Sequence, residues 1–251
     1  MITSPYANHA LLFPEKTAIQ MKDAVLTYRE WDDAVRRTAA WFQALDVENK
    51  TAAIYLPNGI PFLQVFAGAA AAGWTAVPLD LKWKEEELSK HLQLAQPAVW
   101  ITTKGLFPKV KGLHPHLHVW EECAAEIAGT MPLADREDSD ETLPFYLGFT
   151  SGSTGSPKGF IRSHLSWMES FTCTRLEFGI GASDHVLIPG PLLHSHFLYG
   201  AMSTLSIGGT LHILEKFSPE QTLTALAEHA VSVVYVVPRH FYEKIKQWSS
   251  R

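Results

Sequence analysis

The chain has 251 residues, of which 46% are hydrophobic and 19% charged, and its formal net charge is −5 at pH 7. This composition predicts a globular protein with a sizeable core, in one large domain or two ordinary ones. The mild acidic balance excludes the basic surface of a nucleic-acid-binding protein and the polybasic patch of a membrane-bound one.

The cysteines and the N-terminus indicate the compartment. Cys123 and Cys173 are isolated and form no CxxC pair, so a disulfide framework is not expected. The N-terminal residues show no basic segment followed by an apolar one, and therefore no signal peptide. We expect a cytoplasmic protein with reduced thiols.

The first half of the chain alternates between helical and strand patterns. Apolar residues at helical spacing predict a helix over residues 28–45, and Thr27 with Glu30 reads as its capping box. The most apolar stretch, residues 62–79, contains Gln64 and Pro78 and fits a buried helix followed by a strand better than a membrane span. The remaining expected elements here are strands over 51–56, 74–79 and 98–102 and helices over 61–72 and 85–95.

The alternation of helical and strand patterns weakens between residues 104 and 142 and then resumes. A charged run at residues 135–141 reads as a surface loop, so we place a subdomain boundary there. Ser218 is the expected N-cap of a later helix, and Pro238 is expected to open a final one. The expected elements of this half are strands over 145–149, 160–162, 186–189, 210–214 and 231–237 and helices over 163–178, 197–207 and 219–229.

Alternating strands and helices imply parallel pairing with right-handed crossovers. The predicted fold is therefore α/β, with two packed α/β subdomains and largely parallel sheets. We assign residues 1–140 to the first subdomain and residues 141–251 to the second.

One segment carries recognisable chemistry. Residues 150–159 read Thr-Ser-Gly-Ser-Thr-Gly-Ser-Pro-Lys-Gly and follow an apolar strand. Glycines let the backbone approach a ligand, successive N–H groups can form an anion-binding nest, and hydroxyls donate to phosphate oxygens. Lys158 adds a positive charge. The pattern predicts a phosphate-binding loop, whereas a Ser/Gly surface linker would not be expected directly after an apolar strand.

The spacing of glycine, serine and lysine in residues 150–159 differs from that of two known loops. A Walker A loop needs glycine five residues after Gly152, where Pro157 stands, and a serine or threonine after Lys158, where Gly159 stands. A nucleophile elbow needs G-x-S-x-G, which does not occur in this segment.

Residues 150–159 closely resemble the phosphate-binding signature of the adenylate-forming superfamily, which includes acyl- and aryl-CoA synthetases, luciferases and nonribosomal peptide adenylation domains. The resemblance extends over essentially the whole chain. Weaker similar blocks, in the order and spacing of the superfamily, lie at residues 13–19, 26–30, 56–58, 72–80 and 191–194. The resemblance implies the N-terminal portion of the large domain of such an enzyme.

The resemblance also implies a reaction and its site residues. A carboxylate attacks the α-phosphate of ATP to give an acyl-adenylate, and a thiol, usually that of coenzyme A, then displaces AMP; Mg²⁺ assists. A mobile loop would bind the β- and γ-phosphates, with glycines that permit close approach. Its residues by resemblance are Thr150, Ser151, Gly152, Ser153, Thr154, Gly155 and Lys158. His194, in Pro191-Leu-Leu-His194, would line the acyl pocket near the carboxylate.

Two features depart from the superfamily. Many members have glycine three residues after the motif histidine, where this chain has Phe197, which would narrow the acyl pocket or tilt the following helix. The superfamily's adenine- and ribose-binding blocks, its Mg²⁺-binding glutamate and its catalytic lysine have no counterpart before Arg251. We therefore expect a second subdomain that is incomplete at its C-terminus, a chain that is inactive alone, and self-association through the face left open.

Other interpretations remain. An amino-acid-activating domain usually carries an acidic residue near the motif histidine, and no Asp or Glu occurs from Pro189 to Gly209, so a fatty or aryl acid fits better. A non-catalytic binding or assembly module that keeps the fold is an alternative of another class. His114, His116 and His118 alternate along a short strand pattern, but no further ligand is spaced to complete a metal site, and we predict none.

Overall fold

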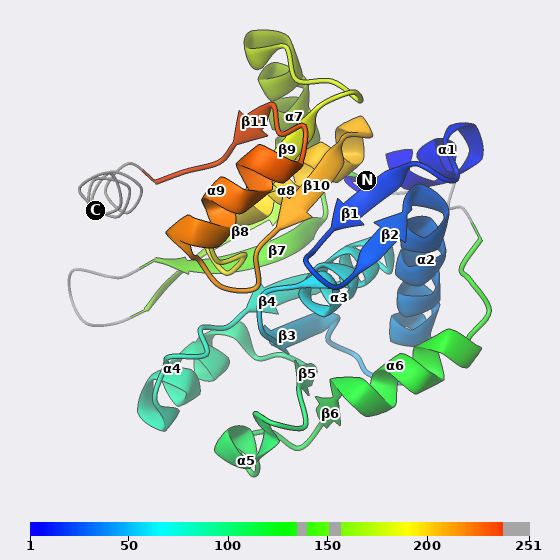
Figure 1. The fold of residues 1–251 in the computed structure, drawn as a ribbon. Coiled ribbons are helices and arrows are strands. Elements are labelled where there is room, and N and C mark those ends of the chain that lie inside the picture. Colours follow the sequence, from blue (N-terminus) through cyan, green and yellow to red (C-terminus); the bar gives the residue numbers. More distant parts are fainter. Residues whose placement is uncertain (135–139, 151–156, 238–251) are drawn as a thin grey trace. The chain divides into compact units, whose positions relative to one another are not determined.

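The computed structural model describes residues 1–134, 140–150 and 157–237. Its helices are α1 (Pro5–Leu12), α2 (Tyr28–Ala44), α3 (Ile60–Ala71), α4 (Glu85–Ala95), α5 (Phe107–Val110), α6 (Trp120–Gly129), α7 (His164–Phe178), α8 (Ser195–Ile207) and α9 (Pro219–Glu228). Its strands are β1 (Thr17–Gln20), β2 (Val25–Thr27), β3 (Thr51–Tyr55), β4 (Thr75–Pro78), β5 (Val99–Thr102), β6 (Leu117–Val119), β7 (Pro144–Thr150), β8 (Lys158–Ser163), β9 (His185–Ile188), β10 (Thr210–Ile213) and β11 (Val233–Val234). Helices and strands alternate along most of the chain (Figure 1), which confirms the predicted α/β class.

The strands form two sheets. One has five strands in the order β11-β9-β10-β1-β2, and the other has six in the order β6-β5-β3-β4-β7-β8. Among the strand pairs of the described residues, β1–β2 and β7–β8 are antiparallel and the others are parallel. The sheets are therefore largely parallel, as the alternation predicts.

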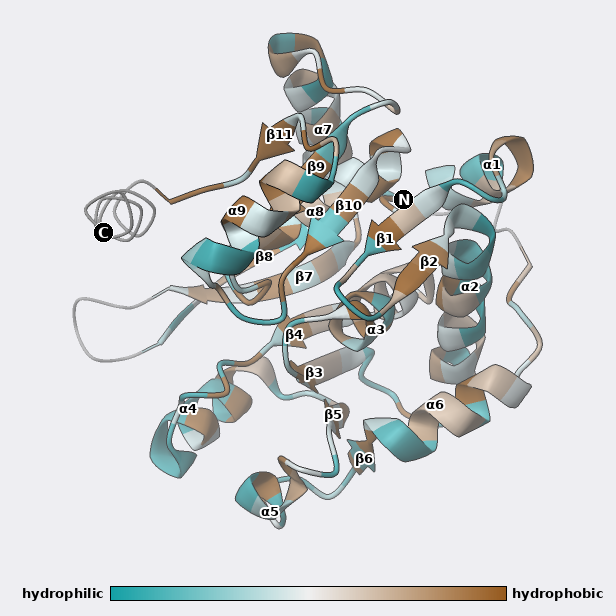
Figure 2. Ribbon diagram, in the orientation of Figure 1, coloured by the Kyte–Doolittle hydropathy of each residue, from teal (hydrophilic) through white to brown (hydrophobic). Residues whose placement is uncertain are grey.

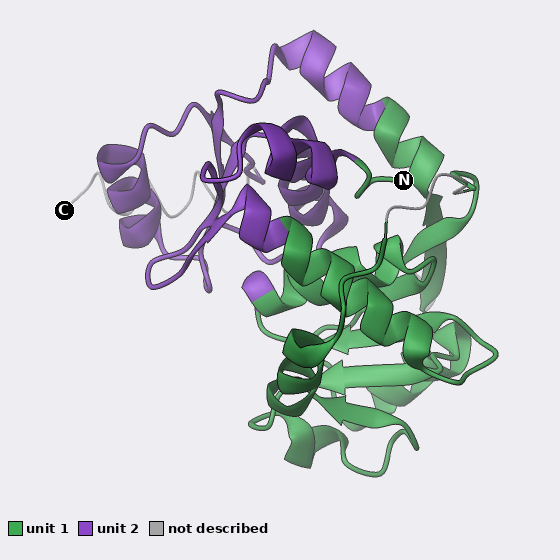
Figure 3. Ribbon diagram, turned by 90° about the vertical axis from the view of Figure 1, so that its right-hand side faces the viewer, with its two compact units in different colours: residues 1–4, 32–57, 61–169 green, residues 5–31, 58–60, 170–251 purple. Residues whose placement is uncertain are grey.

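The chain divides into two compact units (Figure 3), at other places than the predicted boundary between residues 140 and 141. The first unit comprises residues 1–4, 32–57 and 61–169, and the second residues 5–31, 58–60 and 170–251. Strand pairing explains the difference. The β7–β8 hairpin joins the first unit's sheet through β4, whereas the N-terminal strand β1 pairs with β10 of the second.

Side chains of the N-terminal segment hold it in the second unit by closing the end of α8. Tyr28 donates to the carbonyl of Gly209 at 2.7 Å, and the His9 ring donates to that of Ser206 at 2.9 Å. The Lys16 ammonium donates to the carbonyls of Gly208 and Ala182. A helix C-terminus leaves carbonyls without intrahelical partners, and His9 and Lys16 satisfy those of Ser206 and Gly208.

Helix α2 has the structure that its sequence pattern predicts. The apolar residues Trp31, Val35, Ala39 and Phe42 recur at helical spacing and are buried. The capping box is present, because Thr27 N–H donates to Glu30 at 2.8 Å and Glu30 N–H donates to the Thr27 hydroxyl at 3.3 Å. The helix therefore begins where predicted.

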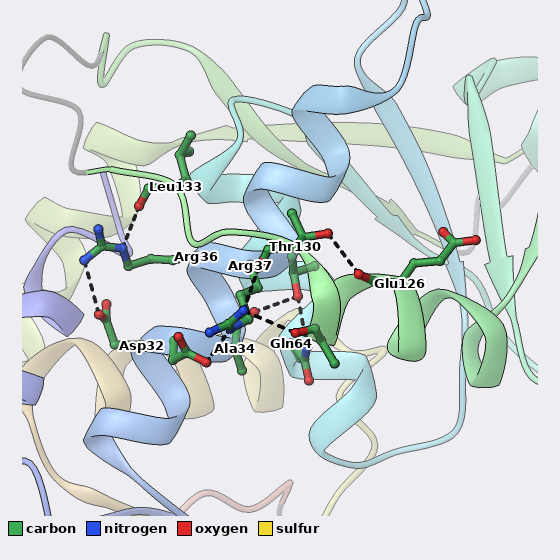
Figure 4. A network of polar contacts seen from close by, with 11 residues as sticks. Asp32, Ala34, Arg36, Arg37, Gln64, Glu126, Thr130 and Leu133 are labelled. Atoms are coloured by element: carbon green, nitrogen blue, oxygen red, sulfur yellow. Dashed lines mark hydrogen bonds and ion pairs between the residues drawn. The ribbon is translucent and has the colours of Figure 1, made fainter.

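The polar side of α2 binds the segment after α6 within the first unit (Figure 4). Arg37 donates to the carbonyl of Thr130 at 2.6 Å, and Arg36 donates to that of Leu133 at 2.6 Å. Gln64 of α3 donates to the Thr38 hydroxyl at 2.9 Å. These bonds join elements far apart in the sequence.

A hydrophobic core of the first unit lies between α4 and the strands β3, β4 and β5. Helix α4 buries Leu88, Leu92 and Ala95 against it and leaves its hydrophilic residues outside, which appears as alternating brown and teal in Figure 2. The sheet contributes Ala53, Tyr55, Val77, Leu79 and Trp100. The apolar stretch over residues 62–79 is α3 followed by β4, as predicted, and no helix in the described part of the chain is long and apolar enough to span a bilayer.

The structure differs from the predictions where apolar periodicity is short. Helices α1, α5 and α6 and strands β1 and β2 were not predicted, and α8 begins at Ser195 rather than at residue 197. The strand expected over residues 231–237 is limited to Val233–Val234, which pair with β9 and form the end of the sheet among the described residues. The helix expected from Pro238 lies outside the described residues.

Candidate functional site

The predicted phosphate-binding loop is the connection of the β7–β8 hairpin. Thr150 ends β7 and Lys158 begins β8, and the two residues are opposite each other in the antiparallel register. Both side chains are exposed. Ser151, Gly152, Ser153, Thr154 and Gly155, which were predicted to bind phosphate with them, lie outside the described residues, as does the expected mobility of this loop.

The hairpin stem is built on a close approach at Gly148. A β-carbon at Gly148 would lie 2.3 Å from the Phe160 ring and 2.6 Å from the Tyr146 hydroxyl, so only glycine fits. The rings of Phe160 and Tyr146 meet edge to face at 5.5 Å, and the Arg162 guanidinium lies 5.6 Å from the Phe160 ring centre. Burial raises the pKa of the Tyr146 hydroxyl, which therefore stays neutral. This packing makes the stem a firm support for the loop.

An aromatic cluster supports the last residues of β7. The His91 ring stacks on Trp83 with ring centres 3.6 Å apart, and the His91 and Phe149 rings are perpendicular with centres 4.5 Å apart. The Nδ1 of His91 lies 2.6 Å from the Glu87 carbonyl within α4. Because Phe149 directly precedes Thr150, this cluster holds the start of the loop against α4.

His194 is the N-cap residue of α8 in the second unit. Its side chain is exposed, and its backbone N–H donates to the Pro191 carbonyl at 3.1 Å, which closes a turn over residues 191–194. The carbonyl of His194 then accepts from Leu198 N–H at 3.1 Å in the first turn of the helix. The structure thus places His194 in this turn, while Thr150 and Lys158 belong to the first unit.

Phe197 stands at the position where the superfamily often has glycine. A β-carbon at Gly190 would lie 2.2 Å from the Phe197 ring, so the ring lies directly over Gly190. Phe197 is 6% exposed, and α8 is regular from Ser195. The large side chain is therefore accommodated by a glycine before the turn.

Asn58 was not predicted as a site residue. Its carboxamide makes hydrogen bonds with backbone groups of Gly190 and Leu192, at the turn that ends with His194, and of Leu214, which follows β10. The sequence contained a weak signal, because Asn58 ends one of the blocks that resemble the superfamily. For Trp83 and His91 the sequence offered none, since nothing in their spacing indicates that both lie against Phe149.

The histidines form no metal site in the described residues, where no group of three His, Cys, Asp or Glu is arranged to hold an ion. His114 contacts the Pro97 carbonyl at 2.8 Å, and His118 packs edge-on against Trp41. In the second unit, His185 Nδ1 lies 3.0 Å from His212 Nε2. Cys123 and Cys173 are free thiols, the first buried and the second exposed.

Comparison with protein families decides what the chain is related to. The model of the family described as AMP-binding enzyme matches residues 6–249. The chain belongs to the AMP-binding enzyme family. It is 44% identical over 241 residues to an uncharacterized acyl-CoA ligase, YhfT, of Bacillus subtilis (strain 168), covering 94% of this chain and 49% of that protein. It is 29% identical to a feruloyl-CoA synthase of Amycolatopsis sp., covering 91% of this chain and 47% of that protein.

Solved structures of the family share the fold. The inhibitor-bound N-terminal domain of FACL13 from Mycobacterium tuberculosis matches with a TM-score of 0.85 at 22% identity, over 93% of this chain and 62% of that one. The O-succinylbenzoate coenzyme A synthetase of Bacillus subtilis, in complex with AMP, matches with a TM-score of 0.85 at 23% identity, over 97% of this chain and 64% of that one. This AMP-binding family member spans about half the length of the curated relatives it matches.

Proposed function

We propose that the chain carries the phosphate-binding and acid-binding elements of an acyl-CoA ligase, which joins a carboxylate to coenzyme A through an acyl-adenylate. One observation carries the proposal. The glycine- and hydroxyl-rich segment 150–159 connects two paired strands, with Thr150 opposite Lys158, in a chain of the AMP-binding enzyme family. A hairpin end with this composition is suited to surround the phosphates of ATP.

The phosphate-binding residues of this proposal divide by chemistry. The hydroxyls of Thr150, Ser151, Ser153 and Thr154 donate to phosphate oxygens, and the ammonium of Lys158 neutralises their charge. Gly152 and Gly155 let the backbone N–H groups approach the phosphates. The stem at Gly148 and the aromatic cluster at Phe149 keep both ends of the loop in place.

The acid is proposed to bind beside His194. No carboxylate side chain occurs from Pro189 to Gly209 to hold an ammonium group, so a fatty or aryl acid without an amino group is favoured over an amino acid. The relatives include a feruloyl-CoA synthase and a 2-succinylbenzoate-CoA ligase, whose names point to aryl acids. Coenzyme A is the proposed acceptor.

Mg²⁺ is proposed to arrive on the phosphates of ATP. Mg²⁺ prefers oxygen ligands, usually one or two carboxylates together with phosphate oxygens. No Asp or Glu occurs from Leu143 to Met168, so the hairpin and its flanks supply hydroxyl and backbone groups but no carboxylate. The hairpin by itself does not fit a dedicated Mg²⁺ site.

Replacing Lys158 by alanine is expected to weaken pyrophosphate and ATP binding to the 251-residue polypeptide by roughly 10- to 100-fold, the usual worth of one charge-assisted hydrogen bond. Isothermal titration calorimetry measures the affinities. Lys111→Ala is the matched control, since it removes one exposed charge elsewhere in the first unit. Equal affinities of the wild type and Lys158→Ala would contradict the assignment of the loop.

The same polypeptide is expected to release no measurable AMP when mixed with ATP, Mg²⁺, coenzyme A and a panel of ferulic, 2-succinylbenzoic and octanoic acids. The chain spans about half of its curated relatives, and the loss of several groups that act together removes turnover. A coupled AMP-release assay provides the measurement. Turnover near one per second would show that these 251 residues suffice for catalysis.

A further inference from the structure

The side chain of Asn58 joins three backbone groups of the second unit. Its Nδ2 donates to the Leu214 carbonyl at 2.8 Å and to the Gly190 carbonyl at 3.2 Å. Its Oδ1 accepts from the Leu192 N–H at 2.6 Å. These partners define the orientation of the carboxamide, because a flipped group would set its oxygen against two carbonyl oxygens.

Two of the three partners follow the carboxyl ends of neighbouring strands in the five-stranded sheet. Leu214 directly follows β10, and Gly190 follows β9 by two residues. The two strands are parallel neighbours, so Asn58 connects their carboxyl ends. In α/β sheets, ligands bind at the carboxyl ends of the strands.

The third bond controls the turn that carries His194. Leu192 lies inside the turn that the bond from His194 N–H to the Pro191 carbonyl closes. Leu192 is fully buried, and the Phe197 ring lies close over Gly190. Asn58 therefore holds the backbone at Gly190 and Leu192, directly before His194.

We propose that Asn58 is a positioning residue of the acid site. It ties the backbone of residues 190–192, which follows β9, to Leu214, which follows β10, and so places His194 at the start of α8. The assignment of the acid to this turn rests on the proposed function. The role of Asn58 in holding the turn does not rest on the proposed function, because it is argued from the three hydrogen bonds of its side chain.

Asn58→Asp tests the positioning role of Asn58, because the two side chains have nearly the same shape. The carboxylate still accepts from Leu192 N–H, but its second oxygen faces the carbonyl oxygens of Leu214 and Gly190 without a proton to share. Asn49→Asp is the matched control. Asn49 also donates to a backbone carbonyl, that of Gln96 at 2.5 Å, and accepts from the Thr51 hydroxyl at 2.8 Å, but it lies in the first unit.

Amide hydrogen exchange reports the position of the turn without any ligand. We expect exchange at Leu192 to rise roughly 10- to 100-fold in Asn58→Asp, because two hydrogen bonds are replaced by repulsion. Exchange at Leu211, buried in β10, should stay unchanged, and Asn49→Asp should alter neither. An unchanged rate at Leu192, or an equal rise at Leu192 and Leu211, would overturn the positioning role.

Two further readouts separate positioning from general stability. The imidazole NMR signals of His194 should shift in Asn58→Asp and not in Asn49→Asp, and unchanged signals would overturn the proposal. Affinity for ferulate should fall about tenfold in Asn58→Asp while pyrophosphate affinity stays constant, since one hydrogen-bonded contact to the acid is misplaced.

If the wild type binds none of ferulate, 2-succinylbenzoate and octanoate, the proposed acid site is wrong for this chain. The Leu192 exchange and the His194 signals then still decide whether Asn58 holds the turn. Should Asn58→Asp not fold, Asn58→Ser, which keeps a hydroxyl donor on a shorter side chain, is measured in the same way and against the same outcomes.

Discussion

Replacing Gly190 by alanine is expected to lower the free energy of unfolding by about 3 kcal/mol, because a buried ring occupies the space of the new methyl group. The added β-carbon would lie 2.2 Å from two atoms of the Phe197 ring. Phe197 is 6% exposed, so its ring cannot move away without displacing its neighbours. Chemical denaturation of both proteins at pH 7 measures the difference.

Two companion variants make the cause identifiable. Gly129→Ala is the matched control, because no atom lies within 4 Å of the added carbon at the end of α6, and its effect should be within about 1 kcal/mol of zero or stabilising. Replacing the Phe197 ring by the smaller leucine side chain in the Gly190→Ala background should recover part of the lost free energy of unfolding. If the double variant is as unstable as the sum of the single ones, the ring contact is not the cause.

Acidification from pH 7 to pH 4.5 is expected to destabilise the chain strongly through two buried histidines that stay neutral when folded. His164 is 1% exposed, its ring stacks on Phe145, and its Nδ1 accepts from Ile2 N–H at 3.3 Å. Burial, assisted by the nearby N-terminal ammonium, lowers the pKa of His164 from its ordinary 6.5 to about 4. Protonation of Nδ1 would also break the bond from Ile2.

His212 is the second group. It is 4% exposed, its Nε2 contacts His185, and its Nδ1 has no hydrogen-bond partner among the described residues. Burial first, and then the neighbouring His229 and His185, lower its pKa to about 4. Lys16 lowers the pKa of His185 further and Asp184 raises it, with burial again the largest cause.

The sign follows from where the protons bind. The unfolded chain protonates these histidines near pH 6.5 and the folded chain only near pH 4, so the unfolded state takes up more protons between these values. The stability that the two neutral histidines contribute is therefore fully present above pH 6.5 and is lost as the pH falls towards 4. The expected loss for each histidine is about 1 kcal/mol at pH 5.5 and roughly 2 to 3 kcal/mol at pH 4.5, a large part of the total stability of a small protein.

Denaturant unfolding at pH 7.0, 5.5 and 4.5 tests the prediction. His212→Gln and His164→Gln remove the titrating group, so each should make stability less dependent on pH, whatever its effect at pH 7. His116→Gln, which removes an imidazole at an exposed position, is the control for the substitution itself. Equal acid slopes in all four proteins would show that other groups cause the acid sensitivity.

The candidate site could be predicted in part, because its phosphate loop is a local pattern. Five hydroxyl residues, three glycines and a lysine within ten positions are visible without any tertiary contact. Asn58 was beyond such a reading, since its three partners lie more than 130 positions away in the sequence. The contact of Phe197 with Gly190 is close in the sequence, but no local pattern indicates that the ring lies over the glycine.

The sequence by itself determined the α/β class, most helices and strands, the capping box at Thr27 and the cap at Ser218, since each depends on residues within a few positions of one another. The family resemblance was equally readable. Tertiary structure alone decided which sheet receives each strand. Strand pairing depends on backbone groups distant in sequence, so β1 joins β10 and β7 joins β4, and the compact units cross the boundary that the charged run at residues 135–141 indicated.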